Sequence, residues 1–319
     1  MKSTIVIPNY NEVSYLDACL RSLVGEQADI IVIDNGSIDG SRKLVQEKYP
    51  QVKLICFKNN KGFCKAVNKG IQLAKTEFVI LLNNDTEVEP GFVAALERTM
   101  AADRNLFAAS AKLISMHNRD LIDDAGDLYC ALGWAFAIGK GKPEKAYNKS
   151  YLIFAACGGA AIYRRELLIK LGLFDENHFA YLEDIDIGYR ARIHGYHSVF
   201  EPSARVFHAG SASSGSRYNT FKVKLAAANS VYLIYKNMPW PQILINLPFL
   251  LAGFSIKTLF FIKKGFGKVY LQGLAKGIHM CMTRKGRVHK VKFIWSRFPD
   301  YCRIQLSLWA NVVRRIWSG

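Results

Sequence analysis

The stretch Phe78–Glu89, FVILLNNDTEVE, decides the fold class of this chain of 319 residues. Its first five residues, Phe78–Leu82, are apolar without interruption. A short apolar run bounded by turn residues is typical of a strand buried on both faces, as in a parallel sheet. Asn83, Asn84 and Asp85 end the run abruptly. We therefore expect a central strand of an open α/β sheet here, with polar side chains at its carboxyl end.

Asp85 has two interpretations. Ligands of open α/β sheets bind just beyond the carboxyl ends of the strands, and a carboxylate there can hold a divalent cation that in turn holds a diphosphate. Alternatively, Asn83–Asp85 forms only a turn, because Asn and Asp favour turns by bonding to their own backbone. This segment by itself favours the turn, whereas the rest of the chain favours the metal site.

Apolar strands and amphipathic helices alternate around this stretch. Further strands are expected at residues 3–7, 30–33, 52–57 and 106–114, with helical spacing of apolar residues between the early ones. This alternation predicts a parallel, three-layer α/β sheet with right-handed crossovers. Residues 115–150 are polar and poorly periodic, so they are expected to form an insertion with at most hairpin structure.

Composition and charge narrow the class of protein. Half of the residues are hydrophobic, which excludes a disordered chain, and the net charge of +17 implies an anionic partner such as nucleic acid, a nucleotide or acidic lipid headgroups. Beyond Lys257 the only acidic residue is Asp300. The seven cysteines lack metal-type pair spacing, which indicates a reducing compartment. The first apolar run ends at Pro8, too early for a signal peptide.

Polar side chains follow four of the predicted strands. They are Asn9–Glu12, Asp34 with Ser37 and Asp39, Asn60–Gly62, and Asn84 with Asp85. Because the carboxyl ends of parallel strands share one edge of a sheet, these groups are expected to cradle a nucleotide. Asp34 could accept the imide N–H of uracil or thymine, and helix capping by its neighbours would not exclude this. The chain has neither GxGxxG nor GxxxxGK[ST], so dinucleotide-binding and P-loop motifs have no support.

A second constellation lies further along the chain. Glu183, Asp184 and Asp186 cluster at a predicted helix N-terminus, where the helix dipole alone could account for carboxylates. Arg190 follows Asp186 by four residues and is expected to pair with it. Asp184 is expected to face the crevice, where a carboxylate could deprotonate a hydroxyl. His208 is either a hydrogen-bonded structural residue or a metal ligand, and the nearby acids favour the ligand.

Taken in order, these motifs resemble glycosyltransferase family 2, the inverting enzymes of the GT-A fold. Within that family they are similar to the rhamnosyltransferase-like branch that builds O-antigen and related bacterial polysaccharides. The resemblance covers residues 3–215 and is specific through the order and spacing of its motifs. The segments that carry it are Pro8-Asn9-Tyr10-Asn11, Asp34-Asn-Gly-Ser37-x-Asp39, Asn60-x-Gly62-Phe63 with Asn68 and Gly70, Asn83-Asn84-Asp85, Glu183-Asp184-x-Asp186-x-x-x-Arg190, and His208.

The resemblance implies a nucleotide-sugar donor, either a dTDP- or a UDP-sugar, and Mg²⁺ or Mn²⁺. Asp85 matches the metal-binding acid of the family's Asp-x-Asp motif, whereas Asn83 replaces the first acid and weakens that site. His208 matches a residue that completes the metal or diphosphate site, and Asp184 matches the catalytic base. The residues that the resemblance places at the donor are Pro8, Tyr10, Glu12, Asp34, Ser37, Lys61 and Asn84.

The C-terminal part has a different character. Residues 242–262 are largely apolar and contain Pro248, and a membrane span needs about 20 apolar residues. Basic residues then alternate with Trp295, Trp309 and Trp317, a mixture typical of interfacial helices. We expect residues 1–220 to form the GT-A catalytic domain and residues 221–319 a helical region that associates with the membrane. A single true span and a helical domain with a solvated basic face are the alternatives.

The sequence therefore predicts a metal-dependent inverting hexosyltransferase at the cytoplasmic face of the bacterial inner membrane, peripheral or monotopic. Its expected partners are a nucleotide sugar, a lipid-linked oligosaccharide acceptor and a surface of anionic lipid. The sequence is also compatible with an oligomer. The first candidate donor is dTDP-rhamnose, which would supply rhamnose, and the alternative is a UDP-sugar of GlcNAc, Gal or Glc. A nucleotidyltransferase would need a basic Gly-rich loop that Pro8–Glu12 lacks, and the long apolar runs disfavour a nucleic-acid-binding protein.

Overall fold

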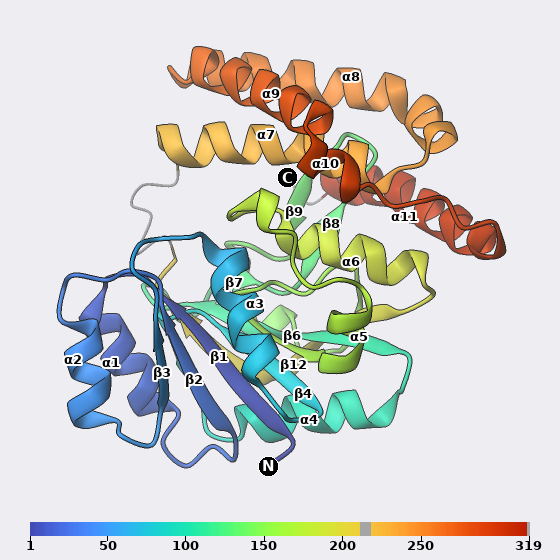
Figure 1. The fold of residues 1–319 in the computed structure, drawn as a ribbon. Coiled ribbons are helices and arrows are strands. Elements are labelled where there is room, and N and C mark those ends of the chain that lie inside the picture. Colours follow the sequence, from blue (N-terminus) through green and yellow to red (C-terminus); the bar gives the residue numbers. More distant parts are fainter. Residues whose placement is uncertain (211–217, 318–319) are drawn as a thin grey trace.

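The structure is a computed structural model that describes residues 1–210 and 218–317. Residues 211–217, which include the end of the stretch that carries the resemblance, lie outside the described residues. A ten-stranded sheet forms the centre of the molecule (Figure 1), with the strand order β10-β12-β6-β11-β4-β1-β2-β3 and with β5 and β7 attached to its flank. Its parallel half consists of β1 (Ser3–Asn9), β2 (Asp29–Asp34), β3 (Lys53–Cys56) and β4 (Phe78–Leu82).

The central strand predicted from the opening stretch is confirmed, because β4 spans Phe78–Leu82 and all five side chains are buried. β11 (Ala160–Arg164) runs antiparallel between β4 and β6 (Leu106–Ser115). β12 (His197–His208) lies parallel to β6. The remaining strands of the sheet are β5 (Thr86–Val88), β7 (Ile122–Asp124) and β10 (Tyr151–Ile153).

Helices cover both faces of the sheet, as the alternation of strands and helices predicts. One face packs against α1 (Val13–Ser22), α2 (Ser41–Lys48) and α4 (Phe92–Ala102). The other packs against α3 (Phe63–Leu73), α5 (Arg165–Lys170) and α6 (Glu183–Ile193). Gly70 lets α3 approach β1 closely, since a Cβ there would lie 2.2 Å from the Val6 side chain. The three-layer α/β architecture follows from these contacts.

The insertion between β6 and β10 holds more regular structure than the expected hairpin, because it also adds a strand, β7, to the central sheet. β8 (Asp127–Tyr129) and β9 (Ala135–Ala137) form a separate two-stranded hairpin. β7 pairs antiparallel with β6, and a short 3₁₀ turn η1 (Glu144–Ala146) precedes β10. A second such turn, η2 (Glu176–His178), lies just before α6. The insertion therefore extends the sheet on the side where β12 ends.

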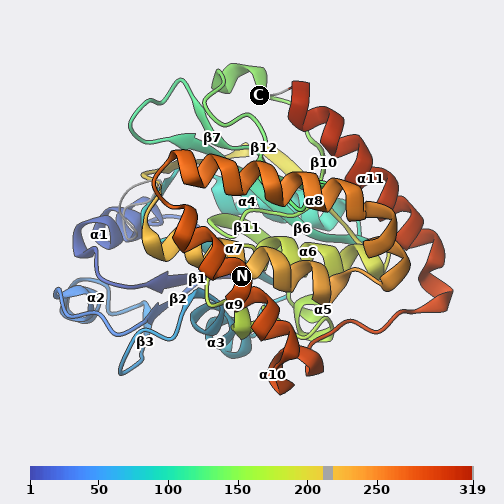
Figure 2. The ribbon, with the colours of Figure 1, turned by 90° about the horizontal axis from the view of Figure 1, so that it is seen from above.

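The C-terminal region is helical. It consists of α7 (Thr220–Asn237), α8 (Trp240–Lys263), α9 (Gly267–Met282), α10 (Arg284–Val288), the turn η3 (Trp295–Arg297) and α11 (Phe298–Trp317). Figures 1 and 2 show α7, α8 and α9 as a layer above the sheet, with α11 beside them. Within the described residues, α8 is one helix long and apolar enough to cross a membrane by length and composition, with a mean hydropathy of 1.8.

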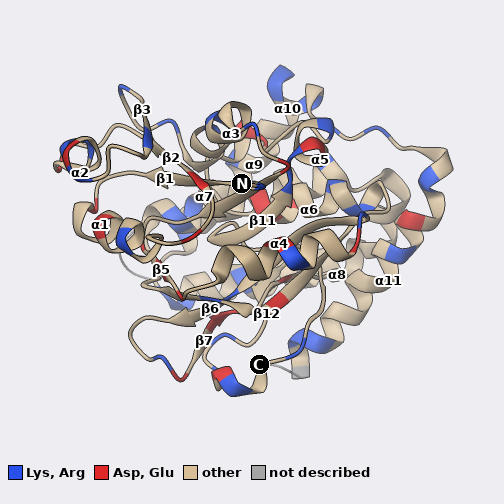
Figure 3. Ribbon diagram, turned by 90° about the horizontal axis from the view of Figure 1, so that it is seen from below, with Lys and Arg blue, Asp and Glu red and all other residues tan. Residues whose placement is uncertain are grey.

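α8 exposes most of its apolar surface. Only 17% of its most apolar window is buried, and its exposed side chains include Leu244, Ile245, Leu247, Leu251, Ile256, Leu259 and Ile262. Figure 3 shows Lys and Arg on α10 and on α11. Monomeric soluble proteins rarely expose large apolar patches unless the patch is a binding surface.

α7 is held against α6 and the segment before it by buried polar contacts. Lys236 on α7 lies 2.8 Å from both Asp175, before η2, and Asp186 on α6. Asn229 donates hydrogen bonds to the carbonyls of three residues before α6, namely His178, Ala180 and Tyr181. The division at residue 220, with 221–319 as a membrane-associating region, stays a prediction.

Candidate active site

The polar groups that follow β1, β2 and β4 meet at one edge of the sheet, as their positions predict. Asn84 donates to Asn9 at 2.8 Å, and Asn9 in turn donates to Ser37 at 3.1 Å. The Asn11 N–H also bonds to the Ser37 hydroxyl. This chain of hydrogen bonds ties the strand ends together, because each amide satisfies a polar group that would otherwise be buried without a partner.

Asp34 is completely buried at the end of β2. Its Oδ1 accepts Arg42 Nε at 2.6 Å and the N–H groups of Gly36 and Ser37. Its Oδ2 accepts one weaker hydrogen bond, at 3.3 Å from Asn9. One carboxylate oxygen is therefore anchored, while the other keeps capacity for a further donor such as the N–H of a base.

The other predicted donor residues surround this edge. Pro8 lies in β1, half-buried, and Tyr10 directly after it is 40% exposed. Glu12 precedes α1 with a φ of 65°, a conformation that non-glycine residues rarely adopt. The Lys61 ammonium lies 5.2 Å from the ring centroid of Phe57. Their roles at a donor stay predictions.

Asp85 and His208 come together although they are far apart in the sequence. After β4 the chain turns into β5, which pairs antiparallel with β12 and sets His208 opposite Thr86. The Ala209 N–H also bonds to the Asp85 carbonyl at 3.0 Å. As a result, His208 Nε2 lies 3.3 Å from Asp85 Oδ1. The expectation that the nearby acids favour a ligand role for His208 therefore has a geometric basis.

Asp123 of β7 orients His208 from the other side. Its Oδ2 lies 2.7 Å from His208 Nδ1, and its Oδ1 pairs with Lys140 at 2.7 Å. Burial would lower the pKa of His208, but the hydrogen bonds that its ring donates to Asp123 and Asp85 raise that pKa to about 9. Burial would raise the pKa of Asp123, but its hydrogen bond with His208 and the charge of Lys140 lower that pKa to about 2.

These residues fit a divalent cation. A carboxylate and an imidazole are both ligands of Mn²⁺, and the Asp85 oxygen and His208 nitrogen are close enough to bind one ion. A carboxylate on the far ring nitrogen, as Asp123 supplies, is the usual support for a metal-bound histidine. Bound metal would displace the proton that His208 otherwise carries.

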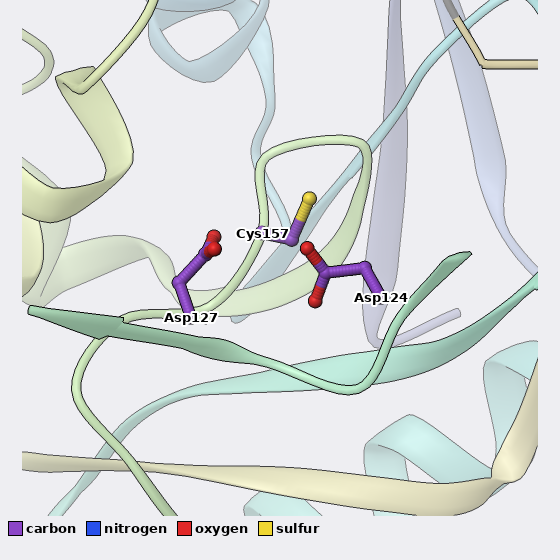
Figure 4. Close-up of side chains that lie close together, drawn as sticks. All are labelled: Asp124, Asp127 and Cys157. Carbon is purple, nitrogen blue, oxygen red and sulfur yellow. The ribbon is translucent and has the colours of Figure 1, made fainter. Parts of the chain in front are cut away.

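β7 also supplies an acid that sequence reasoning missed. Neighbouring strand residues alternate in direction, so Asp123 and Asp124 lie on opposite faces of β7. Asp124 lies close to Asp127 and Cys157 (Figure 4). The ligand atoms of these three groups all lie within 4.8 Å of one another. Burial raises the pKa of Asp124 to about 7 and raises the pKa values of Asp127 and Cys157 well above their usual ranges. We assign them to the base side of the site because Asp127 is hydrogen-bonded to Asp184.

Asp127 lies against the predicted base. A hydrogen bond joins Asp127 and Asp184, and Asp184 also accepts the N–H groups of Gly158 and, at 2.7 Å, of Ile185. Burial raises the pKa of Asp184 and raises that of Asp127 further. A hydrogen bond between two carboxyl groups needs a proton on one of them, and burial favours the protonated form of both. A raised pKa brings a carboxylate closer to the range in which it removes protons efficiently.

Asp186 has the structural role that its spacing to Arg190 predicts. It is fully buried, and its Oδ2 lies 2.6 Å from Arg190 Nη2. Asn237 donates to its Oδ1 at 2.8 Å and Lys236 to its Oδ2 at 2.8 Å. Burial would raise the pKa of Asp186, but Arg190 and Lys236 together hold it far below its usual range. The α7 partners could not be seen in the sequence.

The backbone before the base is held in an unusual conformation. Phe179, Tyr181 and Leu182 all have φ values between 62° and 70°. Asn229 on α7 fixes this segment through its three carbonyl hydrogen bonds. Strained backbone persists only where the surroundings over-determine it, so α7 positions the start of α6 and, with it, Asp184.

Comparison with known proteins identifies the family of the chain. The sequence model described as "Glycosyl transferase family 2" matches residues 4–172. Over 239 residues the chain is 26% identical to the N-acetylglucosaminyl-diphospho-decaprenol L-rhamnosyltransferase of Mycobacterium tuberculosis, covering 66% of this chain and 77% of that protein.

Solved structures share the fold. GalNAc-T7 with UDP, GalNAc and Mn²⁺ aligns with a TM-score of 0.61 and 22% identity over 74% of this chain, which spans about half of that structure, 48%. S. aureus TarS 1-349 with UDP-GlcNAc aligns with a TM-score of 0.60 and 16% identity, covering 88% of this chain and 81% of that one. The fold is therefore GT-A, and the chain belongs to glycosyltransferase family 2.

Proposed function

We propose that this family 2 glycosyltransferase is an inverting, metal-dependent enzyme that moves rhamnose from dTDP-rhamnose to a hydroxyl of a lipid-linked glycan. The observation that carries the proposal is the 3.3 Å approach of His208 to Asp85. β7 connects that pair to the acids beside Asp184, through Asp123 on one face and Asp124 on the other. A group that can hold a donor diphosphate and a group that can take a proton thus meet at one sheet edge.

The side chains have separate tasks in this reaction. Asp184 takes the proton of the acceptor hydroxyl as its oxygen attacks the anomeric carbon. The bond from that carbon to the nucleoside diphosphate breaks on the opposite face, so the configuration inverts. Asp127 keeps its own proton and holds the Asp184 carboxylate in place. Asp34, Ser37 and Asn84 line the nucleoside side of the site.

Asp85 and His208 would hold the divalent cation, with Asp123 fixing the imidazole. When bound, such a cation neutralises the negative charge that develops on the leaving diphosphate. Asn83 stands where the family has a first acid. Asp85 is therefore the only carboxylate that the Asn83–Asp85 segment can offer.

The relative from M. tuberculosis supports both halves of the substrate choice, since its name specifies an L-rhamnosyl donor group and a diphospho-decaprenol acceptor. A UDP-sugar of GlcNAc, Gal or Glc is the second candidate donor. It is favoured by the likeness to TarS, which was solved with UDP-GlcNAc. The two differ in both base and sugar, so a panel of nucleotide sugars separates them.

Replacing Asp85 by Ala should remove Mn²⁺-dependent binding of nucleoside diphosphate and leave the fold intact. Asp85 is the carboxylate that faces His208 Nε2, and a divalent cation needs anionic oxygen ligands. Calorimetric titration of the nucleotide with and without Mn²⁺ measures the effect. Asp120→Ala, at an exposed carboxylate in the insertion, is the matched control. If Asp85→Ala binds the nucleotide as tightly as the natural protein in Mn²⁺, Asp85 does not hold the metal.

We also propose that the protein lies on the cytoplasmic face of the bacterial inner membrane through α8 and the basic residues around it. The exposed apolar side chains of α8 would enter the acyl region. Lys and Arg of the tail, with only Asp300 among them, would contact anionic headgroups. This placement would bring a lipid-linked acceptor to the enzyme.

The full-length protein should therefore sediment with phosphatidylglycerol vesicles at low salt and be partly released at high salt, since salt screens only the electrostatic part. Leu251→Asp combined with Leu259→Asp should abolish sedimentation, because both leucines are exposed on α8, at 62% and 66%. Val24→Asp, at an apolar residue 74% exposed on the catalytic part, should leave it unchanged. A natural protein that stays in the supernatant at low salt would assign α8 to another partner, such as a second copy.

A further inference from the structure

A large cleft connects the active site to α8. Its volume is about 1700 Å³, and it lies between the β7–β9 insertion and helices α7, α8, α9 and α11. Its lining includes Asp123, the residue that holds His208, and Ile256 and Phe260 of α8. A single cleft thus extends from the edge of the catalytic sheet to the exposed apolar helix, both of which appear in Figure 1.

Aromatic rings make up much of the cleft wall. Trp134 and Phe136 come from the β8–β9 hairpin, and Phe260, Phe261 and Tyr270 come from α8 and α9. The hairpin is fixed between two helices, since Trp134 Nε1 donates to the Gly253 carbonyl at 3.1 Å and the Ala131 N–H bonds to the Leu308 carbonyl at 3.1 Å. Apolar walls of this size suit a hydrocarbon chain.

Cations stand inside this apolar wall. Lys257, Lys264, Arg314 and Arg315 line the cleft, and no carboxylate of the described residues lies within 4.0 Å of their nitrogens. Two of these side chains rest on the hairpin instead. Lys257 Nζ lies 5.5 Å from the centroid of the Trp134 ring, and the Arg315 guanidinium lies 5.6 Å from that of Phe136.

Lys257 and Arg315 lie close enough to repel each other. Burial, together with this repulsion, lowers the pKa of Lys257 to about 8. Two cations held on neighbouring rings of one hairpin, without an acidic partner in residues 1–210 and 218–317, form a site with unmatched positive charge. An anion placed between them would pair with both charges.

We propose that this cleft binds the lipid diphosphate of the acceptor, with Lys257 and Arg315 holding the diphosphate and the aromatic wall holding the first part of the hydrocarbon chain. The proposal rests on the proposed function, because it takes the acceptor to be a sugar on a lipid diphosphate. Charge complementarity and continuity with the catalytic edge select this occupant. The sugar would then point toward Asp184 and the chain toward α8.

Binding of farnesyl diphosphate to the full-length protein tests this directly. The probe is soluble, carries both chemical features and needs no sugar transfer. Titrating it in EDTA keeps it from the metal-dependent donor site. We expect its affinity to exceed that of farnesol and of inorganic diphosphate by at least about 10-fold each, since both the chain and the charge contribute.

Lys257→Gln combined with Arg315→Gln should weaken farnesyl diphosphate binding by about 10- to 100-fold, because hydrogen bonds to charged groups are the strong ones. Lys263→Gln combined with Lys268→Gln removes the same charge from exposed positions outside the cleft and should change nothing. Thermal unfolding of both double variants verifies that they fold, and the single variant Arg315→Gln replaces the pair if the pair does not.

Three results would overturn the cleft assignment. The first is equal affinity of the protein for farnesyl diphosphate and farnesol, and the second is unchanged affinity for farnesyl diphosphate in the cleft variant. The third is displacement of farnesyl diphosphate by phosphatidylglycerol at equal concentration, which would make the site a general binder of anionic lipid. Tight, cleft-dependent binding by a protein that transfers no sugar to a lipid diphosphate would support the cleft and contradict the proposed function instead.

Discussion

Asp184→Asn should lower the rate of sugar transfer by about 10²- to 10⁴-fold, the usual effect of removing a positioned general base. The substitution keeps the shape of the side chain, and the amide oxygen can still accept the Ile185 N–H and the Asp127 hydrogen bond. The site should therefore stay assembled. Affinity for the nucleotide sugar and for Mn²⁺ should remain within a few-fold of the natural values, because no hydrogen bond or ion pair of the described residues joins Asp184 to Asp85 or His208.

Initial rates of transfer and calorimetric donor affinity, measured on the same preparation, separate these two effects. Near-normal transfer by Asp184→Asn would remove the base assignment. Asp127→Asn is an informative companion, since an amide can still donate to the Asp184 carboxylate as the protonated Asp127 does. It should retain much more activity than Asp184→Asn if Asp127 only positions the base.

Asp186→Asn should act on stability rather than on chemistry. The buried carboxylate is held by Arg190 at 2.6 Å and by Lys236 at 2.8 Å. Breaking a buried ion pair by removing one partner typically costs about 3–5 kcal/mol, because the remaining charge stays buried without compensation. Urea unfolding should show a loss of this order, while donor affinity of the folded protein is kept.

Asp186 should also make the protein sensitive to acid. Its folded-state pKa lies below the ordinary value of an aspartate, about 3.9. The stabilisation is therefore fully present above the unfolded pKa and is lost as the pH falls below it. Asp186→Asn should flatten this acid-side fall in a stability profile. A variant of normal stability whose transfer rate collapses would instead move the role of base from Asp184 to Asp186.

The parallel half of the fold could be predicted because its signals are local. The apolar run Phe78–Leu82 and its abrupt polar end suffice to identify β4. The meeting of the polar strand ends followed from the same logic, since parallel topology brings the ends of β1, β2 and β4 to one edge of the sheet. The pairing of Asp186 with Arg190 was also local, as the two lie one helical turn apart.

The acids of the insertion could not be predicted in the same way. Asp123, Asp124 and Asp127 stand in a polar stretch without periodicity. The pairing of β7 with β6 places Asp123 and Asp124, and the bridge between Asp127 and Ala155 places Asp127. The available signal was the run Ile122-Asp123-Asp124 itself, since two acids directly after an apolar residue suit a strand end. The α7 partners of Asp186 and of the backbone before α6 depend on tertiary packing alone.

The most direct measurement is a transfer assay with the purified full-length protein, a panel of nucleotide sugars and a GlcNAc-diphospholipid acceptor, with and without Mn²⁺. Mass spectrometry identifies the product and NMR gives its anomeric configuration. We predict a lipid-linked disaccharide that carries rhamnose from dTDP-rhamnose, of inverted configuration, formed only with a divalent cation and lost in Asp184→Asn. Transfer that proceeds unchanged in EDTA, or a product of retained configuration, would contradict the mechanism proposed for this site.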